Sequence, residues 1–243
     1  GRIPEVGTTA LTGVGLCFPI ISLITAFTYL YGNGGAPLCS MERGKGNDEE
    51  AEHLMGNAFT LLIGTGIVLT IIGLIFYKPI LYLFGASDDT FPYAGSYIQI
   101  HLLGTVFVMV SVGMNPFINS QGFGNTGMIS VLIGAVLNII LDPIFIFVLN
   151  LGVRGAAIAT IISQFCSTVW VLVFLTGKRA VLHLKWSCMW LQWKRVLRII
   201  GLGVSSFIMA FTNSLVQVVC NATLQVYGGD IYVGVMTVLN SVR

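Results

Sequence analysis

Apolar residues occur in long continuous runs along this chain, separated by short polar stretches. The runs predict helices over residues 8–31, 55–77, 93–117, 127–149, 155–177 and 197–225, and a further helix that begins near residue 231. An α-helix needs about 20 residues to cross a bilayer, and each complete run is at least that long. The runs are continuous rather than alternating, which favours membrane-spanning helices over the strands of a transmembrane barrel.

The composition supports this interpretation. Apolar residues make up 55% of the chain, charged residues only 9%, and the mean hydropathy is +0.87. Soluble domains carry about 25% charged residues. The predicted fold class is therefore an all-α integral membrane protein that crosses the bilayer several times. Small residues such as Gly155, Ala159 and Ser163 recur at helical spacing, as expected where membrane helices pack closely.

Lysine and arginine are distributed unevenly between the two sides of the predicted helices. One side holds Lys178, Arg179, Lys185, Lys194, Arg195 and Arg198 in residues 178–198, together with Arg43 and Lys45 in a predicted loop at 41–53. The other side holds only Arg2, Lys78 and Arg154. The positive-inside rule places the first group in the cytoplasm, so the net charge of +2 reports topology and no nucleic-acid partner is expected.

Residues 178–195 carry basic side chains together with Trp186, Trp190 and Trp193. This pattern predicts an amphipathic linker at the cytoplasmic membrane interface, between a first segment (1–177) and a second segment (196–243).

Motifs that suggest an enzyme fail on their context. "GFGNTG" (122–127) matches a dinucleotide-binding pattern, but a membrane-length apolar run precedes it where a strand is required. The five cysteines lack C-x-x-C spacing, and we expect them to be reduced. No histidine, cysteine and carboxylate cluster predicts a metal or a catalytic centre. Nothing in the sequence supports a cofactor or an enzyme, and a membrane enzyme is the least favoured alternative.

Asp142 is an isolated acid. No other Asp, Glu, Lys or Arg lies between Asp89 and Asp142, and the next charge is Arg154. Asp142 lies about 22 Å from Gly127 and about 15 Å from Gly152 at the helical rise, which predicts a position inside the bilayer, toward the outer leaflet. A charge there costs about 2.5–3.5 kcal/mol on insertion scales, so we favour a functional role. The alternative is a helix N-cap, because Pro143 follows it.

The neighbours of Asp142 form a candidate ion site. Asn138 lies one turn earlier on the same helix face. Pro143 removes a backbone donor and predicts a hinge that frees a carbonyl. On the next helix, Thr160 and Gln164 have the same spacing and are positioned to face the acid. Such oxygen ligands suit H⁺ or Na⁺.

The quoted residues resemble a known family. "GAVLNIILDPIFIF" followed by "GVRGAAIATIISQ" resembles the fifth and sixth helices of the multidrug and toxic compound extrusion (MATE) transporters, closest to the DinF-like branch. "AGSYIQIHLLG" and "LQVYGGDIYVGVMTVLNSV" resemble the fourth helix and the junction of the seventh and eighth. The resemblance implies a full protein of twelve helices in two six-helix lobes. This chain would contain helices two to six of the N-lobe (1–177), the linker, and helix seven with the start of eight (196–243).

The resemblance also assigns roles to individual residues. It makes Asp142 the ion-coupling acid, with Asn138 and Thr160 as its partners and a possible Na⁺ site. Tyr97 and Asn115 match the family's polar pocket, and we assign Gln164 to the same pocket. Two features depart from the family. The first helix, which carries the other N-lobe acid, is not matched, and the seventh helix has Asn213 and Asn221 in place of an acid, so the sequence does not predict a coupling acid there.

The expected function is an antiporter of the inner cell membrane that exports organic cations and drugs in exchange for H⁺ or Na⁺ by alternating access. We expect a monomer whose other partners are membrane lipids. A lipid-linked oligosaccharide flippase of related fold is the alternative. It would be expected to carry a more cationic cavity, whereas Lys and Arg here lie outside the helix cores or at their margins.

Overall fold

A computed structural model of the protein describes residues 7–242; Arg2 and the other residues of 1–6, and Arg243, lie outside the described part. Within that part every regular element is a helix. The α-helices are α1 (Gly7–Gly15), α2 (Phe18–Gly44), α3 (Asp48–Leu83), α4 (Phe91–Leu103), α5 (Thr105–Ser120), α6 (Gly124–Pro143), α7 (Gly152–Thr176) and α8 (Trp193–Val242). A π-helical turn, η1 (Ile144–Val148), and a 3₁₀ turn, η2 (Trp186–Met189), complete the set. The all-α prediction is confirmed.

Up to six segments are long and apolar enough to cross a membrane. Five are single spans, Thr9–Gly44, Asp48–Leu83, Gly124–Val148, Gly152–Thr176 and Trp193–Gly229, and the sixth is the bent pair α4 and α5. They correspond to the predicted runs. The middle of α3 leaves a row of large apolar side chains exposed, as expected for a lipid-facing helix: Ile67, Val68, Ile71, Ile72, Ile75 and Phe76.

The predicted loop at 41–53 is longer than the observed turn, because both flanking helices extend into it. α2 continues to Gly44 and α3 begins at Asp48. The Asn47 side chain caps α3 by accepting a hydrogen bond from the Glu50 amide at 3.3 Å. Three acids in the first turn, Asp48, Glu49 and Glu50, are favourable at a helix N-terminus. The 36 residues of α3 exceed a bilayer core of about 30 Å at about 1.5 Å per residue, so the helix projects beyond it.

The predicted single helix at 93–117 is two helices. α4 ends at Leu103, α5 begins at Thr105, and the two are bent by 58°. The intervening Gly104 packs against α7, where a Cβ atom would lie 2.5 Å from Ile161. The Thr70 hydroxyl of α3 donates to the Leu102 carbonyl at 2.9 Å, which satisfies one acceptor freed by the break.

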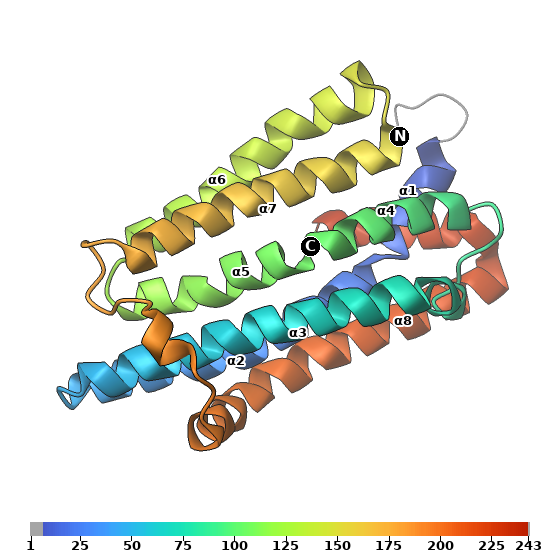
Figure 1. The fold of residues 1–243 in the computed structure, drawn as a ribbon. Coiled ribbons are helices and arrows are strands. Elements are labelled where there is room, and N and C mark those ends of the chain that lie inside the picture. The colour runs from blue at the N-terminus through green and yellow to red at the C-terminus, as the bar shows by residue number, and fades with distance from the viewer. Residues whose placement is uncertain (1–6, 243) are drawn as a thin grey trace.

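The last predicted boundary corresponds to Gly229. Its backbone, at φ 65° and ψ −167°, interrupts α8, so a new helical piece follows, close to the predicted start near residue 231. This piece packs on α1, where Val233 is buried and Gly234 lies against Thr12. Figure 1 shows the chain turning back at this point.

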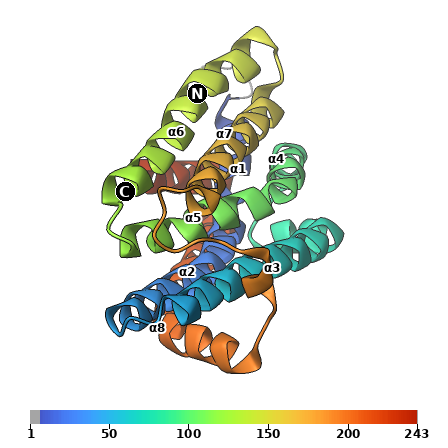
Figure 2. The ribbon, with the colours of Figure 1, turned by 60° about the vertical axis from the view of Figure 1, so that its left-hand side comes forward.

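α2 forms the centre of the bundle. It packs most extensively against α8 and also contacts α3 and α5. Close approach to α8 depends on glycine, since a Cβ atom at Gly34 would lie 2.1 Å from the Ile199 carbonyl oxygen. α6 and α7 form a separate pair that packs on α5 (Figures 1 and 2). Only Gly127, Ser130 and Gly134 of α6 are buried, so most of this helix faces outward.

The segment between α7 and α8 is an irregular strap with one 3₁₀ turn. Leu182, Leu184 and Cys188 are buried against the bundle, whereas Trp186, Trp190 and Trp193 are 83%, 78% and 73% exposed. This division suits the predicted interfacial linker, whose position at a membrane surface stays a prediction. The strap lies at the same end of the bundle as the α2–α3 turn, and Lys185 forms an ion pair with Glu52 that raises the pKa of the lysine.

Candidate functional site

Asp142 lies inside the helical run formed by α6 and η1. The N-cap position of η1 is Pro143, and no side chain caps that turn, so the structure does not support the capping interpretation of Asp142. The span ends at Val148, which places Asp142 about 9 Å from that end at the helical rise. Asp142 is therefore nearer to the end of its span than the sequence predicted from its distance to Gly152. The reason is that the span stops at Val148, before the α6–α7 turn. The side chain is partly buried.

Asn138 connects Asp142 to the facing helix α7. Its amide nitrogen lies 3.4 Å from an Asp142 carboxylate oxygen and 3.3 Å from the Thr160 hydroxyl oxygen. Thr160 also donates to the Ala156 carbonyl at 2.9 Å, the bond within its own helix that a threonine often makes. The structure therefore brings together the three residues that the sequence assigned to ion coupling. We name Asp142, Asn138 and Thr160 the acid cluster.

Tyr97 joins this cluster from α4. Its side chain is 8% exposed. The Tyr97 hydroxyl interacts with the Thr160 hydroxyl and is near enough to the Asp142 carboxylate to interact with its charge. On its other side, the ring stacks on His101 with centroids 5.7 Å apart. His101 is buried, and neither ring nitrogen has a hydrogen-bond partner among the described residues. Sequence reasoning did not single out this histidine, which adjoins the bend at Gly104.

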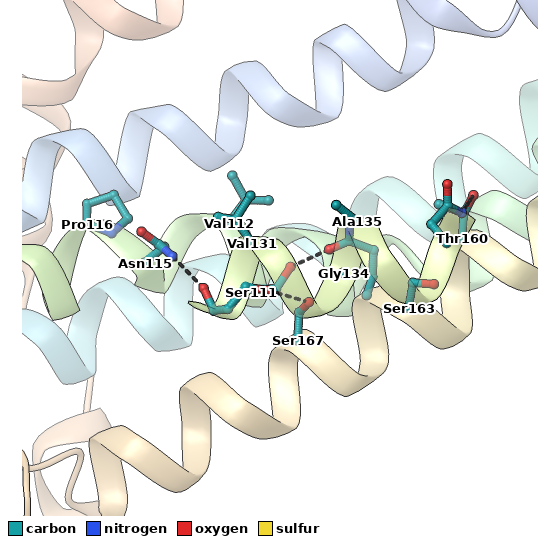
Figure 3. A pocket seen from close by; sticks show the side chains of 13 residues that line it. Ser111, Val112, Asn115, Pro116, Val131, Gly134, Ala135, Thr160, Ser163 and Ser167 are labelled. Atoms are coloured by element: carbon teal, nitrogen blue, oxygen red, sulfur yellow. Dashed lines mark hydrogen bonds between the residues drawn. The ribbon is translucent and has the colours of Figure 1, made fainter. Parts of the chain in front are cut away.

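A polar cavity of about 410 Å³ begins at Asn138 and Thr160 and extends between α5, α6 and α7 (Figure 3). Asn115 and Gln164 line it. Asn115 donates to the Gly127 carbonyl at 2.8 Å and to the Ser130 hydroxyl at 2.6 Å. Gln164 accepts a 2.6 Å hydrogen bond from Ser111, so it faces α5 and the cavity rather than the acid. Of the predicted pocket residues, Tyr97 lies with the acid cluster, and it does not line this cavity.

Four serines complete the cavity wall, and sequence reasoning assigned none of them to a pocket: Ser111, Ser130, Ser163 and Ser167. Two of them could have been found, because Thr160, Ser163, Gln164 and Ser167 recur at three- and four-residue spacing and form one polar stripe on α7. All the side chains that line the cavity are uncharged. The Ser167 hydroxyl also donates to the Ser130 carbonyl at 2.9 Å, which links α7 to α6 beside the cavity.

The chain changes its helical geometry directly after Pro143. The Leu149 amide bonds to the Ile144 carbonyl at 3.0 Å, a five-residue step that defines the π-helical turn. Such single π turns are frequent at functional sites and mark places where the regular ladder is interrupted. The acid cluster and this turn are therefore adjacent on α6.

Comparison with known proteins identifies the family. A family model described as MatE matches residues 3–144, which include α1 to α6 and the acid Asp142. The chain belongs to the MATE family. Its all-helical fold and the order of its spans agree with this assignment, and the resemblance noted in the sequence is confirmed.

The similar curated proteins are named for multidrug export or multidrug resistance. The chain is 28% identical over 223 residues to the multidrug export protein MepA of Staphylococcus haemolyticus, covering 90% of this chain and 48% of that protein. It is 28% identical to the probable multidrug resistance protein YoeA of Bacillus subtilis, covering 71% and 38%. The chain thus spans about half the length of the curated relatives it matches.

Solved MATE structures share its fold. The MATE multidrug transporter DinF-BH superimposes with a TM-score of 0.88 at 35% identity, over 96% of this chain and 52% of that one. An inward-facing MATE family transporter of the MOP superfamily gives a TM-score of 0.90 at 25% identity, over 95% and 52%.

Proposed function

We propose that this MATE chain is part of a secondary active antiporter of the inner cell membrane, which exports organic cations in exchange for H⁺ or Na⁺. The observation that carries the proposal is the position of Asn138, 3.4 Å from Asp142 and 3.3 Å from Thr160. It makes Asp142 a carboxylate inside a membrane span with polar partners on two helices. An acid in this setting is costly, and such residues mark ion and substrate pathways.

The coupling step follows from the charge on Asp142. Binding of a proton or Na⁺ neutralises the carboxylate and removes the cost of holding a charge in the span. An ion that binds one conformation more tightly shifts the population toward it, which is the basis of alternating access. Pro143 and the π turn after it give α6 a place to bend in that change, beside the acid that loads the ion.

The groups around Asp142 accommodate H⁺ as the coupling ion without rearrangement. The Asn138 amide presents its nitrogen to both the Asp142 carboxylate and the Thr160 hydroxyl. A proton on Asp142 leaves this arrangement intact. Sodium requires oxygen ligands, so the amide would have to rotate to present its carbonyl oxygen instead.

The cavity supports a cationic or neutral substrate. Its lining combines serine, threonine and amide groups with apolar side chains and contains no Lys or Arg. A partly buried carboxylate near one end of the cavity penalises anions, because like charges repel strongly where water is scarce. A flippase for anionic lipid-linked substrates would require the opposite charge, so the exporter is favoured.

The test is the substitution Asp142→Asn in the full-length transporter, reconstituted in vesicles. This change keeps the shape and the hydrogen bonding of the side chain and removes its ionisable group. Ion-driven efflux of a lipophilic cationic dye should fall to background, while binding of the dye persists. Asn138→Ala and Thr160→Ala should reduce efflux less, because these residues position the acid and do not carry the ion.

The matched control is Asp89→Asn, the same chemical change at an exposed acid of the α3–α4 turn. It should transport normally. Vesicles with only a pH gradient or only a Na⁺ gradient distinguish the two ions, and a pH gradient alone should suffice. Normal ion-driven efflux by a well-expressed Asp142→Asn protein would disprove the coupling role.

A further inference from the structure

A second cavity lies at the other end of the α6–α7 pair, where the strap begins. It has a volume of about 780 Å³ and shares no lining residue with the polar cavity. Its walls come from the start of α6 and the end of α7, and Lys178 and Arg179 stand at its mouth. We name this cavity the basic groove.

The interior of the basic groove is mainly apolar. The rings of Phe123 and Phe174 meet edge to face with centroids 5.1 Å apart. Ile129 and Val173 line it and are 38% and 63% exposed, so the groove is open along the outer face of the two helices. Both helices are membrane spans. A groove of this kind inside the bilayer is filled by hydrocarbon chains, because water gains no hydrogen bonds there.

Trp170 marks the depth of the groove. Its indole nitrogen donates to the Thr126 carbonyl oxygen of α6 at 3.4 Å, which joins the two helices across the groove. Tryptophan is enriched at the level of the lipid headgroups, where one side of the ring is apolar and the N–H is polar. The groove therefore runs from the headgroup region toward the bilayer interior.

The two cations at the mouth are uncompensated. Lys178 and Arg179 are exposed and form no ion pair with any residue that the structure describes. Three other cations of the same region are paired: Lys185 with Glu52, Arg195 with Glu50, and Arg198 with Glu42. Residues 143–229 contain no Asp or Glu. Positive charge is thus left free at this place, next to an apolar groove.

The turn that carries these cations is anchored. The backbone amides of Val181 and Leu182 both donate to the side-chain oxygen of Gln121, at 3.0 and 2.9 Å. Gln121 is 4% exposed, and its own carbonyl accepts a 3.0 Å hydrogen bond from Arg43. The backbone that follows Lys178 and Arg179 is therefore held against the bundle, which keeps the two cations near the groove.

We propose that the basic groove binds an anionic glycerophospholipid of the cytoplasmic leaflet. One acyl chain lies between α6 and α7 along Ile129, Val173 and Phe174, and the headgroup phosphate lies between Lys178 and Arg179. Basic pockets between membrane helices on the cytoplasmic side bind anionic headgroups in this way. Arginine offers paired donors to a phosphate and lysine a compact charge, so the two complement one another.

The test compares two lipids on the purified full-length transporter by native mass spectrometry. The lipids are phosphatidylglycerol and phosphatidylcholine with identical acyl chains. The wild type should bind phosphatidylglycerol preferentially. Lys178→Gln combined with Arg179→Gln should weaken that binding about 25-fold, from about fivefold for each cation near an anionic lipid, and leave the binding of phosphatidylcholine unchanged. The matched control is Lys194→Gln combined with Arg154→Gln, two exposed cations outside the groove, which should keep the preference.

A second variant tests the groove itself. Val173→Trp fills it at an exposed position and should reduce the binding of both lipids, without removing a charge. Millimolar inorganic phosphate should not compete, because it lacks the acyl chain. Equal binding of both lipids by the wild type would overturn the proposal, as would a preserved preference in the double glutamine variant. If the double glutamine variant fails to express, unchanged lipid binding by Val173→Trp is sufficient to overturn the proposal.

Discussion

Arg195, in the first turn of α8, forms a two-point ion pair with Glu50, in the first turn of α3. Its Nη2 lies 2.6 Å from one carboxylate oxygen, and its Nε lies 3.1 Å from both. The side chains are only 14% and 22% exposed. The pair connects the helix that follows the strap to the helices that precede it, so two segments far apart in sequence are held at one end of the bundle.

Removal of this pair should destabilise the protein. Exposed pairs contribute about 0–1 kcal/mol and the loss of one partner of a buried pair costs about 3–5 kcal/mol, so we expect about 2 kcal/mol for Arg195→Ala. Glu50→Gln, Arg195→Ala and the double variant form a cycle that can be measured by thermal unfolding in detergent. The double variant should be less destabilised than the sum of the single variants. Strict additivity would show that the two side chains do not interact.

Asn57 should hold the strap in place. It is fully buried on α3, and its amide nitrogen donates to the Cys188 and Trp190 carbonyls at 3.3 and 3.1 Å. Its amide oxygen accepts from the Gln192 backbone at 2.8 Å. Asn57→Ala leaves these strap groups without partners, at about 1–3 kcal/mol for each group that stays buried.

Limited trypsin digestion measures the effect of Asn57→Ala, since Lys178, Arg179 and Lys185 lie in the strap. Cleavage there should become faster in this variant than in wild type. The exposed Asn125, in the first turn of α6, provides the control, and Asn125→Ala should leave the digestion rate unchanged. Equal rates for the two variants would show that Asn57 does not anchor the strap.

His101→Phe should not reduce stability. In the wild type the His101 and Tyr97 rings stack with centroids 5.7 Å apart, and phenylalanine retains this stack. The change also removes two buried ring nitrogens that have no partner among the described residues. An unsatisfied buried polar group costs about 1–3 kcal/mol, which offsets the slightly larger ring. His101→Ala should be less stable by about 2 kcal/mol or more because it leaves a cavity. If the two variants are equally unstable, the histidine nitrogens are bonded to buried water in the folded protein.

Gly203→Ala should separate α8 from α2. A Cβ atom at this position would lie 1.9 Å from the Leu30 carbonyl oxygen, and backbone cannot yield as a side chain can. Gly201, two residues earlier on the same helix, has nothing within 4 Å of its Cβ position. Gly201→Ala should therefore be neutral or raise stability by about 0.5–1 kcal/mol, whereas Gly203→Ala lowers the thermal unfolding temperature and the yield. Similar effects at both positions would contradict the packing seen here.

The number of spans, the all-α class and the pairing of Asn138 with Asp142 were predictable from sequence because each rests on local spacing. An apolar run of bilayer length predicts a helix in any context. Asn138 and Asp142 are one turn apart on one helix, so they meet wherever that helix lies. The Gly155, Ala159 and Ser163 face is buried in the structure, as its spacing predicted.

Other features depended on contacts between distant segments. The contact between the α2–α3 turn and the start of α8 depends on Glu42 and Glu50, whose partners Arg198 and Arg195 are far along the chain. The bend at Gly104 depends on Ile161 of α7 and Thr70 of α3. Gln164 has the same spacing from Thr160 as Asn138 has from Asp142, yet it turns to Ser111. Spacing along one helix specifies which residues share a face, but only the packing of the helices decides what that face meets, because the partners come from elsewhere in the chain.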